Sequence, residues 1–164
     1  PTGLSQEDVN TYFYPLDAVY HWNRIYGRRG FIQYQPVFPE ADGSKGVRAL
    51  IERLVAEGTS SFLAVLKQMG GHETGPLGFP MKGLTLAVDL PRAPGIVNFL
   101  DELDRLVLDH GGRVYLAKDG SMSAETFRQM YPRLDEFKSI QQRLDPKGMM
   151  SSDQSRRLVI TQAP

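Results

Sequence analysis

Residues 61–90 read SFLAVLKQMGGHETGPLGFPMKGLTLAVDL, with two apolar runs on either side of a glycine-rich segment. The runs at 61–69 and 84–90 are rich in aliphatic residues and have the length of β-strands. The segment between them, from Gly70 to Gly83, holds five glycines and two prolines, which is typical of a loop. We therefore predict two strands joined by a long loop.

The segments on both sides of this pair carry further helix and strand patterns. Residues 30–38 alternate in polarity and predict a strand, with Pro36 at an edge or bulge. Residues 44–57 and 95–110 place apolar residues at helical spacing, and a glycine follows each. Residues 113–116 predict a short fourth strand. The order βαββαβ indicates an α+β fold, a ferredoxin-like antiparallel sheet with both helices on one face.

Segments outside this core, which spans 30–116, predict more helix. Residues 15–26 have helical spacing and a proline suited to a first turn. Residues 123–144 predict an amphipathic helical tail with Ser123 as N-cap. Its apolar stripe comprises Phe127, Met130, Tyr131, Leu134, Phe137 and Ile140. No linker or repeat is visible, so we expect a single domain over 1–164.

Side chains alternate across a β-strand, so each longer strand presents one face to the helices and one away from them. The residues expected on the helix face are Ile32, Tyr34, Phe38, Phe62, Ala64, Leu66, Leu84, Leu86 and Val88. Those expected on the opposite face are Gln33, Gln35, Leu63, Val65, Lys67, Met69, Thr85 and Ala87. This mixed face suits a solvated surface as well as it suits a ligand or a docking partner, including a homodimer through the uncovered face.

Composition narrows the classes of protein. The 164 residues include 19 Lys and Arg against 19 Asp and Glu, so the formal net charge is zero. A nucleic-acid-binding protein normally has a basic excess, so we expect no nucleic acid partner. No apolar run approaches the length of a membrane span. The absence of cysteine fits a reducing compartment, and we expect a cytoplasmic protein.

The sequence shows no pattern for a metal centre. His21, His72 and His110 are isolated and have no partner at metal-ligand spacing, so we expect no metal. The glycines that precede His72 lack the lysine and the helix start that a phosphate-binding loop needs.

Two lysines lie where a site could form. The run YLAKD at 115–119 follows the last predicted strand, and a lysine there places a positive charge beyond the sheet edge. On the residues alone, an exposed strand-end lysine is the better explanation of Lys118. For Lys67, the alternative explanation is an edge residue whose ammonium group reaches water.

Five segments together carry a resemblance. They are FYPLDAVYHWNRIYGRRGFIQYQ (13–35), FLAVLKQMG (62–70), GLTLAVDLP (83–91), GGRVYLAKDGSMSAETFRQMYP (111–132) and RLDPKGMMSSDQSRRL (143–158). In this order they resemble the C-terminal half of FAD-linked oxidoreductases of the vanillyl-alcohol oxidase superfamily, within its aldonolactone-oxidase-like branch. The resemblance covers about residues 12 to 158.

The resemblance implies an enzyme that oxidises a sugar or alcohol CH–OH group by hydride transfer to FAD. Members hold FAD mainly in an N-terminal domain, to which nothing in this chain is similar. The chain would therefore be the C-terminal substrate (cap) domain, with its own FAD-binding domain as partner and no activity alone.

The resemblance also assigns roles by position in the motifs. Lys118 matches a lysine near the pyrimidine end of the flavin, where a cation stabilises the negative charge that hydride transfer leaves. Tyr115 matches the tyrosine beside it, which borders flavin and substrate. Both are therefore expected to be catalytic and cofactor-binding.

The expected substrate-binding residues lie on the strands. Gln33, Gln35 and Lys67 match polar residues that line the substrate pocket of the family. Thr85 is a further candidate, although it and Ala87 stand where relatives carry Asn and Cys. Met69 replaces an aromatic residue, so the resemblance leaves the substrate open. A second interpretation also remains, a free-standing ferredoxin-like module that binds a ligand or regulates another protein.

Overall fold

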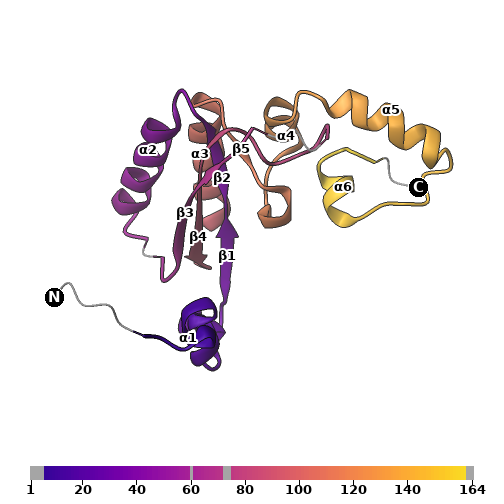
Figure 1. The fold of residues 1–164 in the computed structure, drawn as a ribbon. Helices are drawn as coiled ribbons and strands as arrows, with labels where there is room; N and C mark the ends of the chain where they lie inside the picture. Colours follow the sequence, from indigo (N-terminus) through magenta and orange to yellow (C-terminus); the bar gives the residue numbers. More distant parts are fainter. Residues whose placement is uncertain (1–5, 60, 72–74, 162–164) are drawn as a thin grey trace.

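The structure is a computed structural model that describes residues 6–59, 61–71 and 75–161. Within these residues, one antiparallel sheet is packed against helices, and the last helices extend away from it (Figure 1). No helix in these ranges is both long enough and apolar enough to cross a bilayer.

The sheet is built around its longest strand, β4 (Gly83–Pro91). β1 (Phe31–Tyr34) and β2 (Pro36–Pro39) lie in line along one side of β4, and β3 (Ala64–Met69) lies along the other. β5 (Arg113–Val114) pairs with β2 at the far edge. Every pairing is antiparallel, so the predicted α+β arrangement of strands is confirmed.

β1 and β2 form the single strand predicted over 30–38. The register on β4 is the same on both sides of the break, with Tyr34 opposite Val88 and Val37 opposite Thr85. The break falls before Pro36, which has no backbone N–H to give to the ladder.

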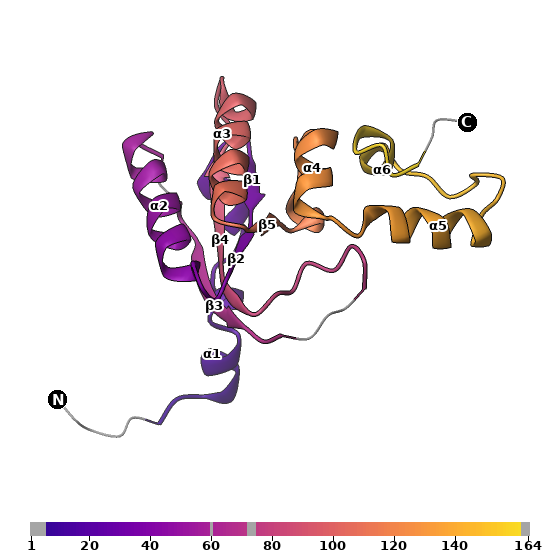
Figure 2. The same ribbon diagram turned by 90° about the horizontal axis from the view of Figure 1, so that it is seen from above.

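The two predicted core helices are confirmed to within a residue at each end. α2 spans Gly43–Ala56 and α3 spans Ile96–Asp109, against predictions of 44–57 and 95–110. They pack against each other beside the sheet (Figure 2).

Two contacts show that both helices cover the same face. On β1, the Tyr34 hydroxyl donates a hydrogen bond of 2.8 Å to Asp104 of α3. On β2, the Phe38 ring lies so close to α2 that a Cβ at Gly46 would come within 2.4 Å of it. Tyr34 and Phe38 share one face of the strand, so the helices do too. Side chains from this face and from the helices form the core, which includes Leu50, Leu54, Leu86, Val88, Leu90, Leu100, Leu103 and Val107.

The predicted burial of the β3 helix face is wrong. Leu66 is 56% exposed, Ala64 is exposed, and Phe62, which precedes the strand, is 62% exposed. β3 pairs only with β4 among the described strands, and the helices pack over β4, β2 and β5 instead. An edge strand beyond the helices leaves its apolar side chains uncovered.

The continuous helix predicted over 15–26 is also wrong. The structure has a short α1 (Val9–Phe13) and two 3₁₀ helices, η1 (Pro15–Ala18) and η2 (Trp22–Tyr26). Between the latter two, His21 adopts a left-handed backbone conformation with φ of +57°, which a continuous right-handed helix does not allow.

The helical tail predicted over 123–144 is divided into α4 (Ala124–Met130) and α5 (Leu134–Leu144). The break precedes Pro132, because a residue before proline is disfavoured in the helical conformation. Ser123 is confirmed as N-cap, since its side chain accepts from the Thr126 amide. The stripe is buried at Phe127, Met130, Tyr131 and Leu134 and becomes exposed by Ile140.

Candidate functional site

The candidate site lies on the sheet face that the helices leave uncovered. We call it the open face and define it by Gln33, Gln35, Lys67, Thr85 and Ala87. The pairing register supports this placement, because Lys67 lies opposite Thr85 and Gln33 lies opposite Asp89. The parity of the strands therefore brings the predicted substrate-binding residues to one side of the sheet.

Lys118 reaches this face from outside the sheet. The predicted last strand ends early, at Val114, and Leu116–Lys118 form a 3₁₀ turn, η3. At the end of that turn the Lys118 ammonium group donates a hydrogen bond to Oε1 of Gln33. Two site residues that lie 85 positions apart in the chain are thus in direct contact.

The charge of Lys118 is not neutralised by the described part of the chain. Its polar partner there is the neutral amide of Gln33, and no Asp or Glu in those ranges lies within ion-pair distance of it. Lys118 is half-buried. A half-buried cation without a carboxylate partner suits a ligand that carries or develops negative charge.

Tyr115 lies at the margin of the open face. Its backbone N–H donates to the Gln35 carbonyl at 2.9 Å, which joins the start of the turn to the strand. Its ring stacks on Phe79 with centroids 4.6 Å apart, and Phe79 belongs to the loop between β3 and β4. The loop therefore packs against the edge of the sheet at this point.

The side chains of Gln35 and Thr85 are hydrogen-bonded to each other. The Gln35 side-chain amide donates to the Thr85 hydroxyl at 3.3 Å, and that hydroxyl donates to the Pro36 carbonyl at 2.8 Å. Thr85 is only 1% exposed. Gln35 thus remains half-buried at the face, whereas Thr85 is buried beneath it and hydrogen-bonded to the Gln35 amide. Lys67 is exposed, and none of the described residues forms an ion pair with it.

Sequence reasoning missed one buried pair beside Gln33. Asp89 of β4 is 2% exposed and accepts a 2.6 Å hydrogen bond from the Tyr26 hydroxyl. Burial, and then the hydrogen bond and charge of Asp89, raises the pKa of Tyr26 to about 12. The available signal was a carboxylate inside the apolar run LTLAVDL, since an acidic residue is rarely buried without a partner.

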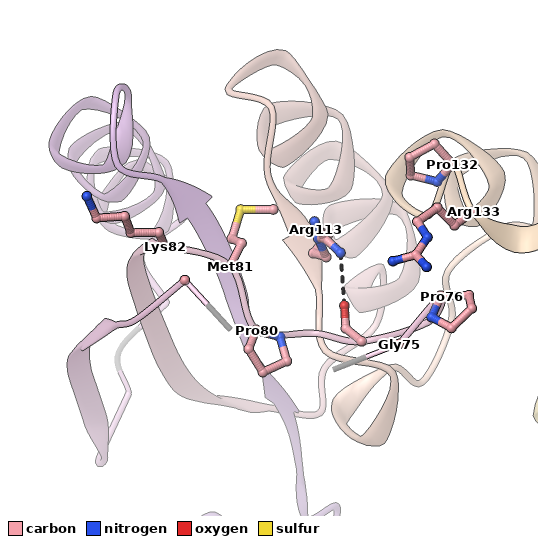
Figure 3. Close-up of a pocket in the computed structure, with 10 residues that line it drawn as sticks. Gly75, Pro76, Pro80, Met81, Lys82, Arg113, Pro132 and Arg133 are labelled. Carbon is pink, nitrogen blue, oxygen red and sulfur yellow. Dashed lines mark hydrogen bonds between the residues drawn. The ribbon is translucent and has the colours of Figure 1, made fainter. Parts of the chain in front are cut away.

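A separate pocket of about 330 Å³ lies beside β5 and the loop that precedes β4 (Figure 3). Its cations already have protein partners. Arg113 donates to the Gly78 carbonyl at 2.9 Å, Lys82 pairs with Glu40 at 2.6 Å, and Arg133 pairs with Glu136. The lining residues include none of the predicted site residues.

The described residues contain no group of three or more His, Asp or Glu side chains placed to hold a metal ion. Of the three histidines of the chain, His72 lies outside the described residues.

Two comparisons with known proteins support the class that the motif order indicates, the C-terminal segment of FAD-linked oxidoreductases in the aldonolactone-oxidase branch. Residues 87–158 match the D-arabinono-1,4-lactone oxidase family. The chain is 43% identical over 152 residues, or 93% of its length, to the decaprenylphosphoryl-β-D-ribose oxidase of Mycolicibacterium smegmatis. It is 41% identical over 113 residues, or 68% of its length, to the "Uncharacterized protein in mprA 5'region" of Streptomyces coelicolor. The predicted resemblance is therefore confirmed.

The chain spans about a third of the length of these relatives, 33% of the first and 31% of the second.

Proposed function

We propose that this chain is the substrate-binding part of an FAD-dependent oxidoreductase that oxidises a hydroxyl group of a sugar or other alcohol. The residues that hold most of the FAD would lie in a further, FAD-binding domain of the same protein. We expect no activity from these 164 residues alone. When bound, FAD would supply a two-electron acceptor: it would take up hydride from the carbinol C–H bond, while the hydroxyl proton passes to solvent and the alcohol becomes a carbonyl group.

Lys118 would bind the pyrimidine end of the flavin and stabilise the negative charge that appears there. The observation that carries this proposal is the Lys118–Gln33 contact, which holds an uncompensated cation at the open face. In a site closed from water, a fixed ammonium group needs no reorganisation when charge develops nearby. Tyr115 would border both flavin and substrate, with its ring orientation fixed by stacking on Phe79.

The remaining open-face residues would orient the substrate. Gln35 and Lys67 offer a neutral amide and a mobile cation, which suit hydroxyl groups and an anionic substituent respectively. Thr85 fixes the Gln35 amide through its own hydrogen bonds. Gln33 is already bonded to Lys118 through Oε1, so its amide nitrogen would remain to donate to the ligand.

The test uses the natural full-length protein and the variant Lys118→Met, which keeps the length of the side chain and removes its charge. We expect a yellow protein in both cases. Sulfite reacts with oxidised flavin and leaves negative charge on the ring, so it reports on a nearby cation without knowledge of the substrate. Loss of one charge-assisted contact, about 1.5–3 kcal/mol, should weaken sulfite binding by about 10- to 150-fold.

Lys45→Met is the matched control, because Lys45 lies on α2, on the covered side of the sheet, with its side chain 80% exposed. It should leave the sulfite dissociation constant unchanged. A colourless full-length protein, or equal sulfite affinities in the wild type and Lys118→Met, would contradict the proposal.

A further inference from the structure

The η3 turn, which carries Lys118, is hydrogen-bonded to the last helix among the described residues. α6 (Asp153–Arg157) lies after a loop that returns from α5 toward the sheet (Figure 1). Its start is fixed by a capping box, in which Ser152 and Ser155 exchange hydrogen bonds. The residue after it, Leu158, is 1% exposed and belongs to the core.

Asp119, the neighbour of Lys118, is where the two segments meet. Its side chain is 2% exposed, and its two oxygens accept four hydrogen bonds. Oδ1 accepts from the amides of Ser121 and Met122 at 3.0 and 2.8 Å, which closes the chain after the turn. One oxygen of the buried carboxylate thus accepts hydrogen bonds from its own loop, and the other accepts them from α6.

Two side chains of α6 bind that second oxygen. Arg157 pairs with Oδ2 of Asp119 at 2.7 Å and also donates to the Met122 carbonyl. Gln154 donates to the same Oδ2 at 3.2 Å and to the Leu116 carbonyl at 2.6 Å, inside the η3 turn. α6 therefore binds one carbonyl on each side of Lys118, that of Leu116 and that of Met122.

We propose that Arg157, assisted by Gln154, is a positioning residue: acting through Asp119, it fixes the η3 turn so that the Lys118 ammonium group stays on Gln33. The inference rests on the proposed role of Lys118 at the flavin. A lysine has four rotatable side-chain bonds, so a fixed backbone is what limits where its charge can go. A displacement of about 1 Å can cost about 100-fold where charge is stabilised by position.

The neighbouring residue Arg156 provides a matched control. It is exposed and bonds to Ser151 and Asp153, both outside the η3 turn. Arg156→Met removes the same charge from the same helix without touching Asp119. Comparison of Arg156→Met with Arg157→Met thus distinguishes the effect of removing a positive charge from α6 from the effect of losing the contact with Asp119.

The first experiment is a double-mutant cycle on sulfite binding in the full-length flavoprotein. Arg157→Met should raise the sulfite dissociation constant about tenfold when Lys118 is present and leave it unchanged in Lys118→Met. A residue that merely supports the fold would weaken binding alike in both backgrounds. If Arg157→Met does not fold, the cycle is run with Gln154→Met, which keeps the ion pair and should give about a threefold effect.

The second experiment does not depend on flavin chemistry. Acetic anhydride labels lysines according to the accessibility of the free amine, and the rate at Lys118 is compared with the rate at exposed Lys45 by mass spectrometry. We expect Arg157→Met to raise this ratio several-fold and Arg156→Met to leave it unchanged.

An unchanged labelling ratio overturns the proposal in every case. Where Lys118→Met weakens sulfite binding, an equal sulfite effect of Arg157→Met in the two Lys118 backgrounds also overturns it. If Lys118→Met itself leaves sulfite affinity unchanged, the proposed role of Lys118 at the flavin fails, and labelling alone then decides whether Arg157 positions the turn.

Discussion

Asp104 should make the stability of this protein depend on pH in the direction opposite to that of an ordinary paired carboxylate. Asp104 lies on α3, is 3% exposed, and accepts the Tyr34 hydroxyl at 2.8 Å. Burial raises its pKa from 3.8 to about 6, and the charges of Asp119 and Asp101 act in the same direction. The hydrogen bond from Tyr34 and the charge of Arg157 oppose this rise without cancelling it.

The magnitude follows from the shift. A folded-state pKa above the unfolded value means that the folded state binds the proton more tightly, so the stabilisation is fully present below pH 3.8. It is lost as the pH rises through about 6. A difference of about two pH units corresponds to about 3 kcal/mol of unfolding free energy lost across this window.

The perturbation is Asp104→Asn, which keeps an oxygen for the Tyr34 hydroxyl and removes the titration. The assay is urea unfolding followed by circular dichroism between about pH 4 and pH 7, with the difference in unfolding free energy taken at each pH. The wild type should lose up to about 3 kcal/mol relative to Asp104→Asn as the pH rises. Asp109→Asn, at an exposed position of the same helix, should follow the wild type. Parallel curves for the wild type and Asp104→Asn would refute the reasoning.

Packing and buried hydrogen bonds give two further predictions, also measured by urea unfolding. Gly46→Ala should lower stability by about 1–3 kcal/mol although alanine favours helix, because its Cβ would lie 2.4 Å from the Phe38 ring. Gly43→Ala, whose Cβ would meet nothing closer than 3.4 Å, should be near neutral, and equal stability of the two variants would count against this explanation. Tyr131→Phe should cost about 1–2 kcal/mol, because the fully buried hydroxyl donates to the Val114 carbonyl at 2.7 Å. A variant as stable as the wild type would show that this hydrogen bond contributes nothing.

The core of the fold could be predicted because its signals are local. α2 and α3 each carry an apolar stripe that ends at a glycine, and β4 is an apolar run with a loop before it and a proline at its end. Alternation along β1 and β4 was enough to assign their faces. The same rule failed for β3, because parity gives the side to which a residue points but not whether a helix extends that far.

The breaks in the outer helices depend on backbone conformation that periodicity does not encode. The apolar spacing of 15–26 continues through His21, although the backbone there is left-handed. In the tail, Pro132 was the readable signal, and the rule that helices end before proline predicts the division between α4 and α5. Spacing outweighed that rule in the prediction of one helical tail.

Only part of the candidate site could be predicted, because strand alternation is a local signal and the contact of Lys118 is not. Strand alternation placed Gln33 and Gln35 on the open face, but the contact with Lys118 depends on a 3₁₀ turn over 116–118, which follows the predicted strand and was not itself predicted. That turn is fixed by Asp119 and α6, a five-residue helix whose polar side chains bind a segment 35 to 38 positions earlier in the chain. No local pattern encodes such a contact. In this chain, therefore, strand alternation accounts for the face on which Gln33 and Gln35 lie, whereas the position of Lys118 on that face is what we propose the C-terminal helix α6 fixes.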